Sequence, residues 1–316
     1  MISARWLEKR KPYWDRLESI VQRSGRGGLG ALSHDELREL GLLYRQVAAD
    51  LSSVREDPMS QRIAGYLNQL LGRAHNLIYM GRRARPGGIL EFYRSVFPRI
   101  FRETFNYTLA AFAVFLGAAV AGFLICLADP AFQRFFLGPR MSDTIERREM
   151  WTHSILTIKP LASSFITTNN LTVSFTTFAL GISGGLGTVY MMATNGLLMG
   201  VIAAACWQAG MGLDLAEFVA PHGVLELPAI FIAGGGGLLI ARGLLFPGSL
   251  PRRDALVVYG GQGVRLALGI VPMLIVAGVI EAFLSPSFVP APAKFVFAFA
   301  VFGLFALYVT QAGRTE

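Results

Sequence analysis

The most informative residues of this chain are ionisable side chains that fall inside or beside long apolar runs. His222 and Glu226 stand four residues apart at the head of an apolar run that ends at residue 240, and Glu281 lies near the end of another. Residues four apart share one face of a helix. An ionisable group in the bilayer interior costs several kcal/mol unless it is paired or hydrated, and such groups are usually functional. These residues therefore predict a polar cluster within the membrane.

Asn169 and Asn170 are expected at the same depth, and we predict that at least one of them is within hydrogen-bonding reach of Glu226. Three interpretations of the cluster remain open. In the first it binds a ligand or cation or relays protons. In the second it holds helices together by hydrogen bonds. In the third it binds a metal ion, because one imidazole and two carboxylates suit iron or manganese, although the spacing matches no known metal motif.

The composition indicates a membrane protein. Of 316 residues, 53% are hydrophobic and 16% are charged, whereas about a quarter are charged in soluble domains. Cys126 and Cys206 both lie in apolar segments and are interpreted as small packing residues. Most of the net charge of +8 precedes the first apolar run, since up to Phe105 there are 18 Lys and Arg against 11 Asp and Glu. In the absence of an aromatic–basic motif, this charge indicates membrane topology and excludes nucleic-acid binding.

Two regions with different patterns follow one another along the chain. Residues 1–105 are predicted to form a helical domain in the cytoplasm or on the membrane surface, with a capping box at Ser33 and Glu36. Residues 106–316 are predicted to form a transmembrane helical domain. The predicted fold is an all-α, polytopic integral membrane protein with about six spans, at residues 107–127, 171–192, 195–207, 223–241, 266–284 and 295–310.

The basic residues also predict an orientation. Six spans bring Arg252, Arg253 and Arg314 to the same side as the basic N-terminal region, and the positive-inside rule makes that side cytoplasmic. The expected location is the bacterial inner membrane, crossed several times, with the N-terminus in the cytoplasm. In a five-span alternative the glycine-rich stretch 181–187 is a re-entrant hairpin and the C-terminus lies outside.

Small residues indicate where helices approach one another closely. Gly196 and Gly200 have the small-xxx-small spacing of helix contacts, and Gly234 and Gly237 provide a similar surface on a later span. We interpret all four as packing residues, acting within one chain or in a homodimer. Asn195 needs a hydrogen-bond partner at the same surface, or it caps a half-helix that begins after residues 181–187, a feature that transporters use for binding sites.

An ordered set of residues resembles a known family. The set comprises Asn169 with Asn170, the glycine run to Gly187, Asn195 and Gly196 with Gly200, the stretch from Pro221 to Glu226, Pro247 and Gly248 followed by Arg252, and Glu281. Together they look like the stage II sporulation protein M family, and the N-terminal region resembles its longer, non-sporulation members. The resemblance implies an integral inner-membrane protein. It also implies a likeness to a scaffold that holds peptidoglycan-remodelling enzymes during forespore engulfment.

The expected function is a membrane scaffold or assembly factor that recruits envelope partners, including peptidoglycan-remodelling proteins. The alternative is a transporter or channel-like protein whose site is His222, Glu226 and Glu281, and a third interpretation is an intramembrane hydrolase. The expected partners are the lipid bilayer, other membrane or envelope proteins and a second copy of the chain, with no cofactor. No common enzyme motif, such as His-Glu-x-x-His, is present. A wet cavity reaching Glu226 would favour transport or hydrolysis, and a dry, fully paired cluster would favour a scaffold.

Overall fold

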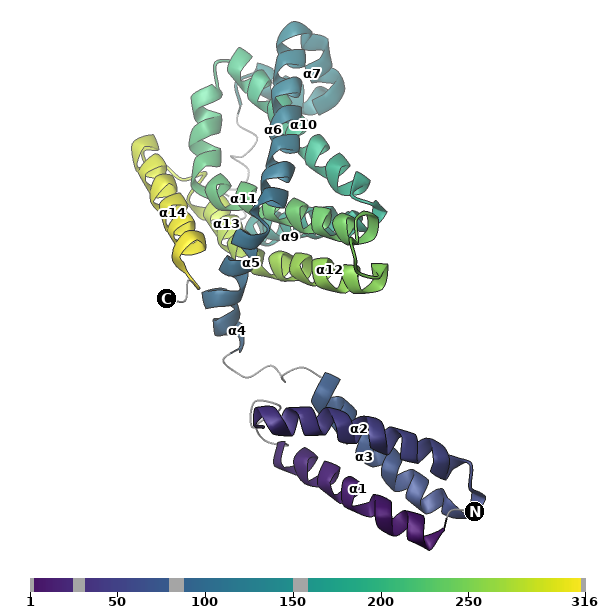
Figure 1. Ribbon diagram of the computed structural model, residues 1–316. Coiled ribbons are helices and arrows are strands. Elements are labelled where there is room, and N and C mark those ends of the chain that lie inside the picture. Colours follow the sequence, from purple (N-terminus) through teal and green to yellow (C-terminus); the bar gives the residue numbers. More distant parts are fainter. Residues whose placement is uncertain (1–2, 25–31, 80–87, 150–158, 314–316) are drawn as a thin grey trace. The chain divides into compact units, whose positions relative to one another are not determined.

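The computed structural model describes residues 3–24, 32–79, 88–149 and 159–313, and within these ranges the chain is helical and contains no strand (Figure 1). The chain separates into two compact units, Met1–Ile89 and Leu90–Glu316. Five helices are long and apolar enough to cross a membrane. The predicted class, an all-α polytopic membrane protein, is confirmed.

The first unit is a bundle of three helices with its own core. The helices are α1 (Ala4–Ser24), α2 (His34–Arg55) and α3 (Gln61–Tyr79), with a short 3₁₀ turn, η2 (Pro58–Ser60), before α3. Each helix contacts the other two, and the fully buried side chains between them include Leu17, Val47 and Leu67. The predicted capping box is present, because the Ser33 hydroxyl accepts from the Glu36 N–H and the Glu36 carboxylate accepts from the Ser33 N–H.

The second unit holds the apolar helices. Its elements in chain order are α4 (Gly88–Glu91), the π-helix η3 (Phe92–Val96), α5 (Phe97–Glu103), α6 (Phe105–Ala128), α7 (Pro130–Leu137), α8 (Pro139–Glu146), α9 (Lys159–Ala179), η5 (Leu180–Ser183), α10 (Leu186–Gln208), α11 (Gly212–Leu245), α12 (Arg252–Gly269), α13 (Val271–Phe283) and α14 (Ala291–Gln311). The longest helix, α11, changes direction along its length (Figure 1). It contacts α6, α9, α10, α12, α13 and α14, and therefore forms the centre of this unit.

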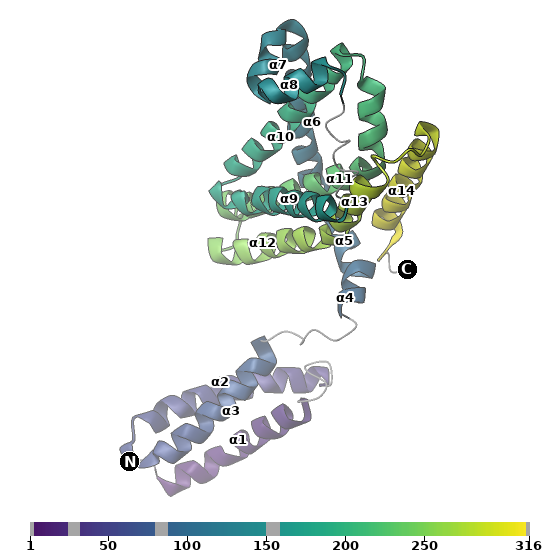
Figure 2. The same cartoon turned by 180° about the vertical axis from the view of Figure 1, so that it is seen from behind.

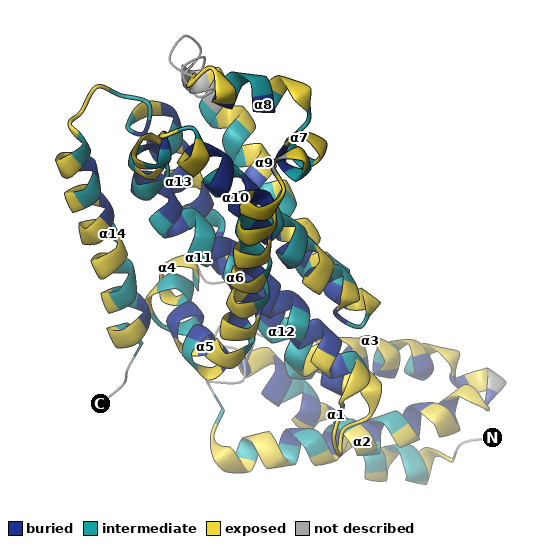
Figure 3. Cartoon of the chain, turned by 90° about the horizontal axis from the view of Figure 1, so that it is seen from above, coloured by how far each residue is buried: buried dark blue, intermediate teal, exposed yellow. Residues whose placement is uncertain are grey.

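The apolar helices differ in how much of their surface the protein covers. Most of α11 is buried, whereas α6 and α14 expose apolar side chains such as Leu124 and Phe299 along much of their length (Figure 3). In the most apolar 18-residue stretch of each helix, 22% of α6 and 17% of α14 is buried inside the protein, against 61% of α11. A large exposed apolar surface suits contact with lipid, so α6 and α14 lie at the periphery of the membrane unit.

The predicted boundaries of the spans need correction. The candidate spans among the described residues are α6, α10, α11, the pair α12–α13 and α14, five where the sequence analysis predicted six. The predicted spans 171–192 and 195–207 are wrong because the chain turns at Gly184 and Gly185, whose φ values are +70° and +87°. Glycine adopts this left-handed region without steric cost. Residues 186–208 then form one continuous helix, α10.

The two ends of the membrane unit lie side by side. The Arg102 guanidinium donates from Nη1 to the carbonyl oxygens of Val309 (2.7 Å) and Ala312 (2.8 Å), and the Tyr308 hydroxyl donates to the Tyr93 carbonyl oxygen (2.5 Å). The start of the first candidate span is thus next to the end of the last one. Helix α9 packs among the spans, although it is not one of the five candidates. Figure 2 shows α9 among α10, α12 and α13.

Glycines allow α6 and α10 to approach to backbone contact. A Cβ atom added at Gly196 would overlap the Phe115 carbonyl oxygen, and one added at Gly200 would overlap the Ala119 carbonyl oxygen. Gly234 and Gly237 of α11 are buried against side chains of α6 and α10, including Ala111 and Thr188. These contacts all lie within one chain. Asn195 does not cap a half-helix, because it lies inside α10 and its Nδ2 donates to the Met191 carbonyl oxygen (2.8 Å).

Candidate functional site

The cluster predicted from the sequence is assembled by two neighbouring helices of the membrane unit. His222 and Glu226 lie on one face of α11, and Glu281 lies near the end of α13, which packs against α11. Helix α11 continues through Pro221 and Pro228, although proline removes a backbone hydrogen bond and promotes a kink. Neighbouring helices stabilise such interruptions in membrane proteins.

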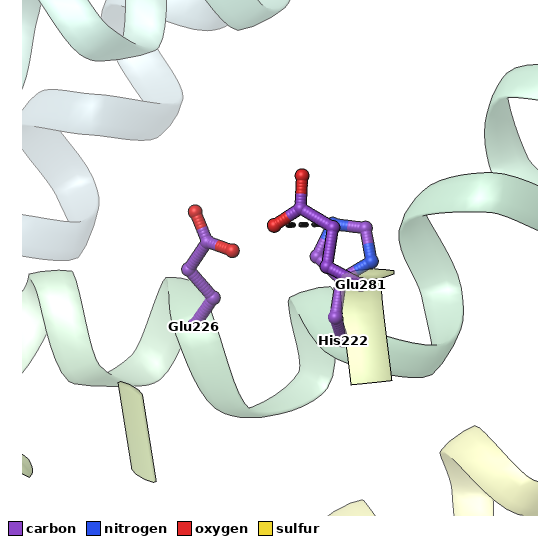
Figure 4. A group of neighbouring side chains, drawn as sticks. All are labelled: His222, Glu226 and Glu281. Carbon is purple, nitrogen blue, oxygen red and sulfur yellow. Dashed lines mark ion pairs between the residues drawn. The ribbon is translucent and has the colours of Figure 1, made fainter. Parts of the chain in front are cut away.

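The three side chains converge on a small volume. One ligand atom of each, an imidazole nitrogen or a carboxylate oxygen, lies within 4.8 Å of the other two. Figure 4 shows the carboxylates of Glu226 and Glu281 facing one another, with the imidazole of His222 beside Glu281. His222 Nε2 is 3.9 Å from Glu281 Oε2, and the exposed fractions of these two side chains are only 7% and 16%.

Hydrogen bonding within the cluster is uneven. His222 Nδ1 is 2.9 Å from the hydroxyl oxygen of Ser285, which follows α13, and the Phe218 ring packs edge-on against the imidazole. In contrast, Oε2 of Glu226 is buried and has no hydrogen-bond partner among the described residues. Most buried polar atoms in proteins are hydrogen-bonded, so an orphan carboxylate oxygen calls for an explanation.

A second polar group, missed by the sequence analysis, lies beside the cluster. Lys294 of α14 is 2% exposed, and its ammonium donates to Glu217 Oε1 (2.8 Å) and to the carbonyl oxygens of Ser285 (2.9 Å) and Ser287 (2.8 Å). A lysine has three N–H donors, and all three are used here. The sequence signal was a lone lysine at the start of the last apolar run. Ser285 joins both groups, since its hydroxyl contacts His222 and its carbonyl accepts from Lys294.

An open cavity of about 900 Å³ is lined by the residues of the second group. Its lining includes Glu217, Phe218, Ser285 and Lys294, together with Asp214 and Arg148. His222, Glu226 and Glu281 do not line it; Phe218 and Ser285, which contact His222, do. The cavity therefore ends one side chain away from the cluster.

The asparagines are not bonded to the cluster. Asn169 Nδ2 donates to Asn170 Oδ1 at 3.3 Å, Asn170 is buried and Asn169 is exposed. In the described part of the chain, neither side chain hydrogen-bonds to Glu226, contrary to expectation. The sequence analysis predicted the same membrane depth for the two asparagines as for His222 and Glu226. Depth does not determine which way a helix face points. On α9 the two asparagine side chains hydrogen-bond to each other.

The cluster is therefore not fully paired, and the 900 Å³ cavity is lined by none of its three residues. Two carboxylates face each other in a buried volume, and like charges so placed cannot both remain ionised without a neutralising positive charge. A proton or a cation supplies that charge. The imidazole adds a neutral nitrogen lone pair or, when protonated, a positive charge at the same place. Chemically, the cluster is suited to hold and release positive charge.

Comparison with known proteins supports the likeness seen in the sequence. The family model described as "Stage II sporulation protein M" matches residues 111–286, which include the whole cluster, and "Domain of unknown function (DUF8413)" matches residues 4–80. An uncharacterized protein of Methanocaldococcus jannaschii, MJ0706, is 27% identical over 116 residues, 36% of this chain and 50% of that protein. This chain thus spans about half of its length. No solved structure matches the chain. Because the first model covers more than half of the chain, this membrane protein belongs to the stage II sporulation protein M family.

Proposed function

We propose that this protein is a transporter or channel-like membrane protein that passes a cation through the cluster of His222, Glu226 and Glu281. The observation that carries the proposal is the buried, unpartnered Oε2 atom of Glu226, which faces a second carboxylate. A structural cluster would use its hydrogen-bonding capacity to join helices. Glu226 joins none of the described helices by a hydrogen bond, so a structural role leaves its presence unexplained.

The adjacent cavity supports access from one side. Its lining includes Phe218 and Ser285, and both of these residues contact His222. A modest movement of either residue would join the cavity to the cluster. Two of the three site residues, His222 and Glu226, lie between Pro221 and Pro228 on α11, which continues as one helix through both prolines. The cavity supports access from one side, and the cluster supports a place to hold positive charge.

A flux experiment with the full chain in liposomes tests this proposal. Proton flux is followed with a pH-sensitive dye trapped in the lumen, and divalent-cation flux with a chelating dye. We expect flux above that of empty liposomes, at least tenfold reduced by Glu226→Gln, which conserves shape and removes the charge. Glu103→Gln is the matched control, because it makes the same change at an exposed glutamate of the membrane unit that belongs neither to the cluster nor to the cavity lining. Equal flux with wild-type protein and with Glu226→Gln would refute the proposal.

A scaffold or assembly factor is the second candidate, favoured by a different observation. The first unit has its own buried core and separates from the membrane unit as a compact body, as expected of a domain that binds partners. In this view the protein lies in the inner membrane with residues 1–89 in the cytoplasm, recruits envelope proteins and pairs with a second copy. Cross-linking in native membranes, with full chain and with residues 1–89 removed, tests it. Identical cross-linked partners in both would count against it.

A further inference from the structure

We propose that His222, Glu226 and Glu281 form a binding site for a divalent first-row transition cation such as Zn²⁺ or Mn²⁺. The ligand atoms are Nε2 of His222 and one carboxylate oxygen each from Glu226 and Glu281. The inference deepens the proposed function by naming the class of cation, and its transport role rests on that proposal. Metal binding itself can be tested without any transport.

The spacing of the ligand atoms is close to what such an ion requires. Bonds from Zn²⁺ to imidazole nitrogen and carboxylate oxygen are about 2.0–2.2 Å long, so ligands in a tetrahedral site lie about 3.4 Å apart. The three atoms already lie within 4.8 Å of one another. Closing the site therefore needs movements on the order of 1 Å, which rotation about the side-chain bonds of two glutamates can supply.

The imidazole is already held in the orientation that a metal ligand needs. When Nδ1–H donates to the Ser285 hydroxyl oxygen, at 2.9 Å, the lone pair of Nε2 is free, and Nε2 lies 3.9 Å from Glu281 Oε2. Histidine ligands in proteins are commonly fixed in this way, through a hydrogen bond from the other ring nitrogen. Ser285 is thus a positioning residue, one step away from the metal.

The charge and the donor set favour a divalent ion with affinity for nitrogen. Two facing carboxylates carry two negative charges, which one divalent cation neutralises without a proton. The Glu226 oxygen that no described group satisfies gains a partner at the same time. Calcium prefers six to eight oxygen ligands, and magnesium keeps most of its water. Imidazole with carboxylates suits zinc, iron and manganese better.

Metal binding is measured on the full chain in mild detergent, purified with a tag that contains no histidine. After treatment with a chelator the protein is dialysed against Zn²⁺, bound metal is counted by mass spectrometry, and affinity is measured against a chromophoric chelator. We expect one ion per chain, with affinity at least tenfold lower in Glu226→Gln and in Glu281→Gln. Ser285→Ala keeps all three ligands and should lower affinity about 10- to 100-fold. Glu103→Gln, at an exposed glutamate outside the cluster and the cavity, should leave it unchanged.

A spectroscopic measurement on the wild-type chain removes any dependence on the folding of variants. X-ray absorption at the zinc edge should show a shell of nitrogen and oxygen with a single imidazole. A sulfur shell, several imidazoles, or no bound zinc would overturn the metal site. The same measurements distinguish the proposed metal site from the proposed transport function. Zinc binding without cation flux leaves the metal site and refutes transport, while proton flux without metal binding refutes the metal site and leaves transport.

Discussion

Replacing Glu226 with leucine should stabilise the folded protein, because the buried Oε2 atom of this carboxylate has no hydrogen-bond partner among the described residues. Oε2 is buried and makes no hydrogen bond with any described group, so its removal leaves no described donor unpaired. A buried polar group without a partner costs about 1–3 kcal/mol. Leucine has a similar volume, so relieving that cost should raise the free energy of unfolding by about 1–3 kcal/mol. For a unit of this size that corresponds to a rise of roughly 2 to 10 °C in Tm.

The ion pair of Lys294 and Glu217 serves as the control, because removing one of its members should destabilise the protein. Lys294 is 2% exposed and uses all three donors on Glu217 and two carbonyl oxygens. Lys294→Met leaves these three acceptors unpaired and should lower the free energy of unfolding by about 3 kcal/mol. Thermal unfolding in detergent, followed by tryptophan fluorescence, measures both variants under the same conditions. A clear fall in Tm for Glu226→Leu would show that Glu226 has structural partners and would refute the reasoning behind the site.

Three further predictions concern other parts of the chain. Gly200→Leu should separate α6 from α10 and lower the yield of folded protein, whereas Gly303→Leu, at a position with open space around it, should be tolerated; equal yields in size-exclusion chromatography would contradict this. Cysteines replacing Arg252 and Phe288 should be labelled from opposite sides of the membrane, with Arg252 on the cytoplasmic side; labelling of position 252 from outside the cell would refute the predicted six-span orientation. Hydrogen bonds from Arg73 and Tyr66 hold the pKa of Glu18 below its usual range. The ionised Glu18 therefore stabilises residues 1–89 at neutral pH, and this stabilisation is lost as the pH falls below about 4.5. The helical circular dichroism signal of residues 1–89 should then be lost at a lower temperature in acid. An unchanged Tm would argue against this role of Glu18.

Some of the architecture follows from the sequence because its signals are local. Helical periodicity and the capping box at Ser33 and Glu36 depend on residues within one helix, and they predicted the first bundle. The spacing of His222 and Glu226 fixed one face of α11 in the same way. Depth along an apolar run was sufficient to bring Glu281 to that face, although depth alone did not prove reliable for Asn169 and Asn170, whose helix presents them to each other.

Other features depend on contacts between residues that are far apart in the sequence, and local sequence patterns do not contain these contacts. The predicted start of a span at residue 223 is wrong because α11 begins at Gly212 and continues through Pro221. Proline stops an isolated helix, but packing against neighbouring helices maintains this one. Lys294 was overlooked because its significance lies in Glu217 and Ser285, residues of two other segments. Its burial is a tertiary property with only a weak sequence signal.

The contrast between Lys294 and Glu226 is the strongest argument for a functional site. Both are ionisable groups in the same region of the membrane unit, and Ser285 connects the two arrangements. The lysine has as many partners as it has donors, which is how folding alone accommodates a buried charge. The Oε2 atom of the glutamate is also buried, and it has no hydrogen-bond partner among the described residues. A requirement for stability explains the first residue and leaves the second unexplained. A requirement to bind and release a cation explains both, because the ion pair keeps the cavity in place while the open carboxylate remains available for a ligand.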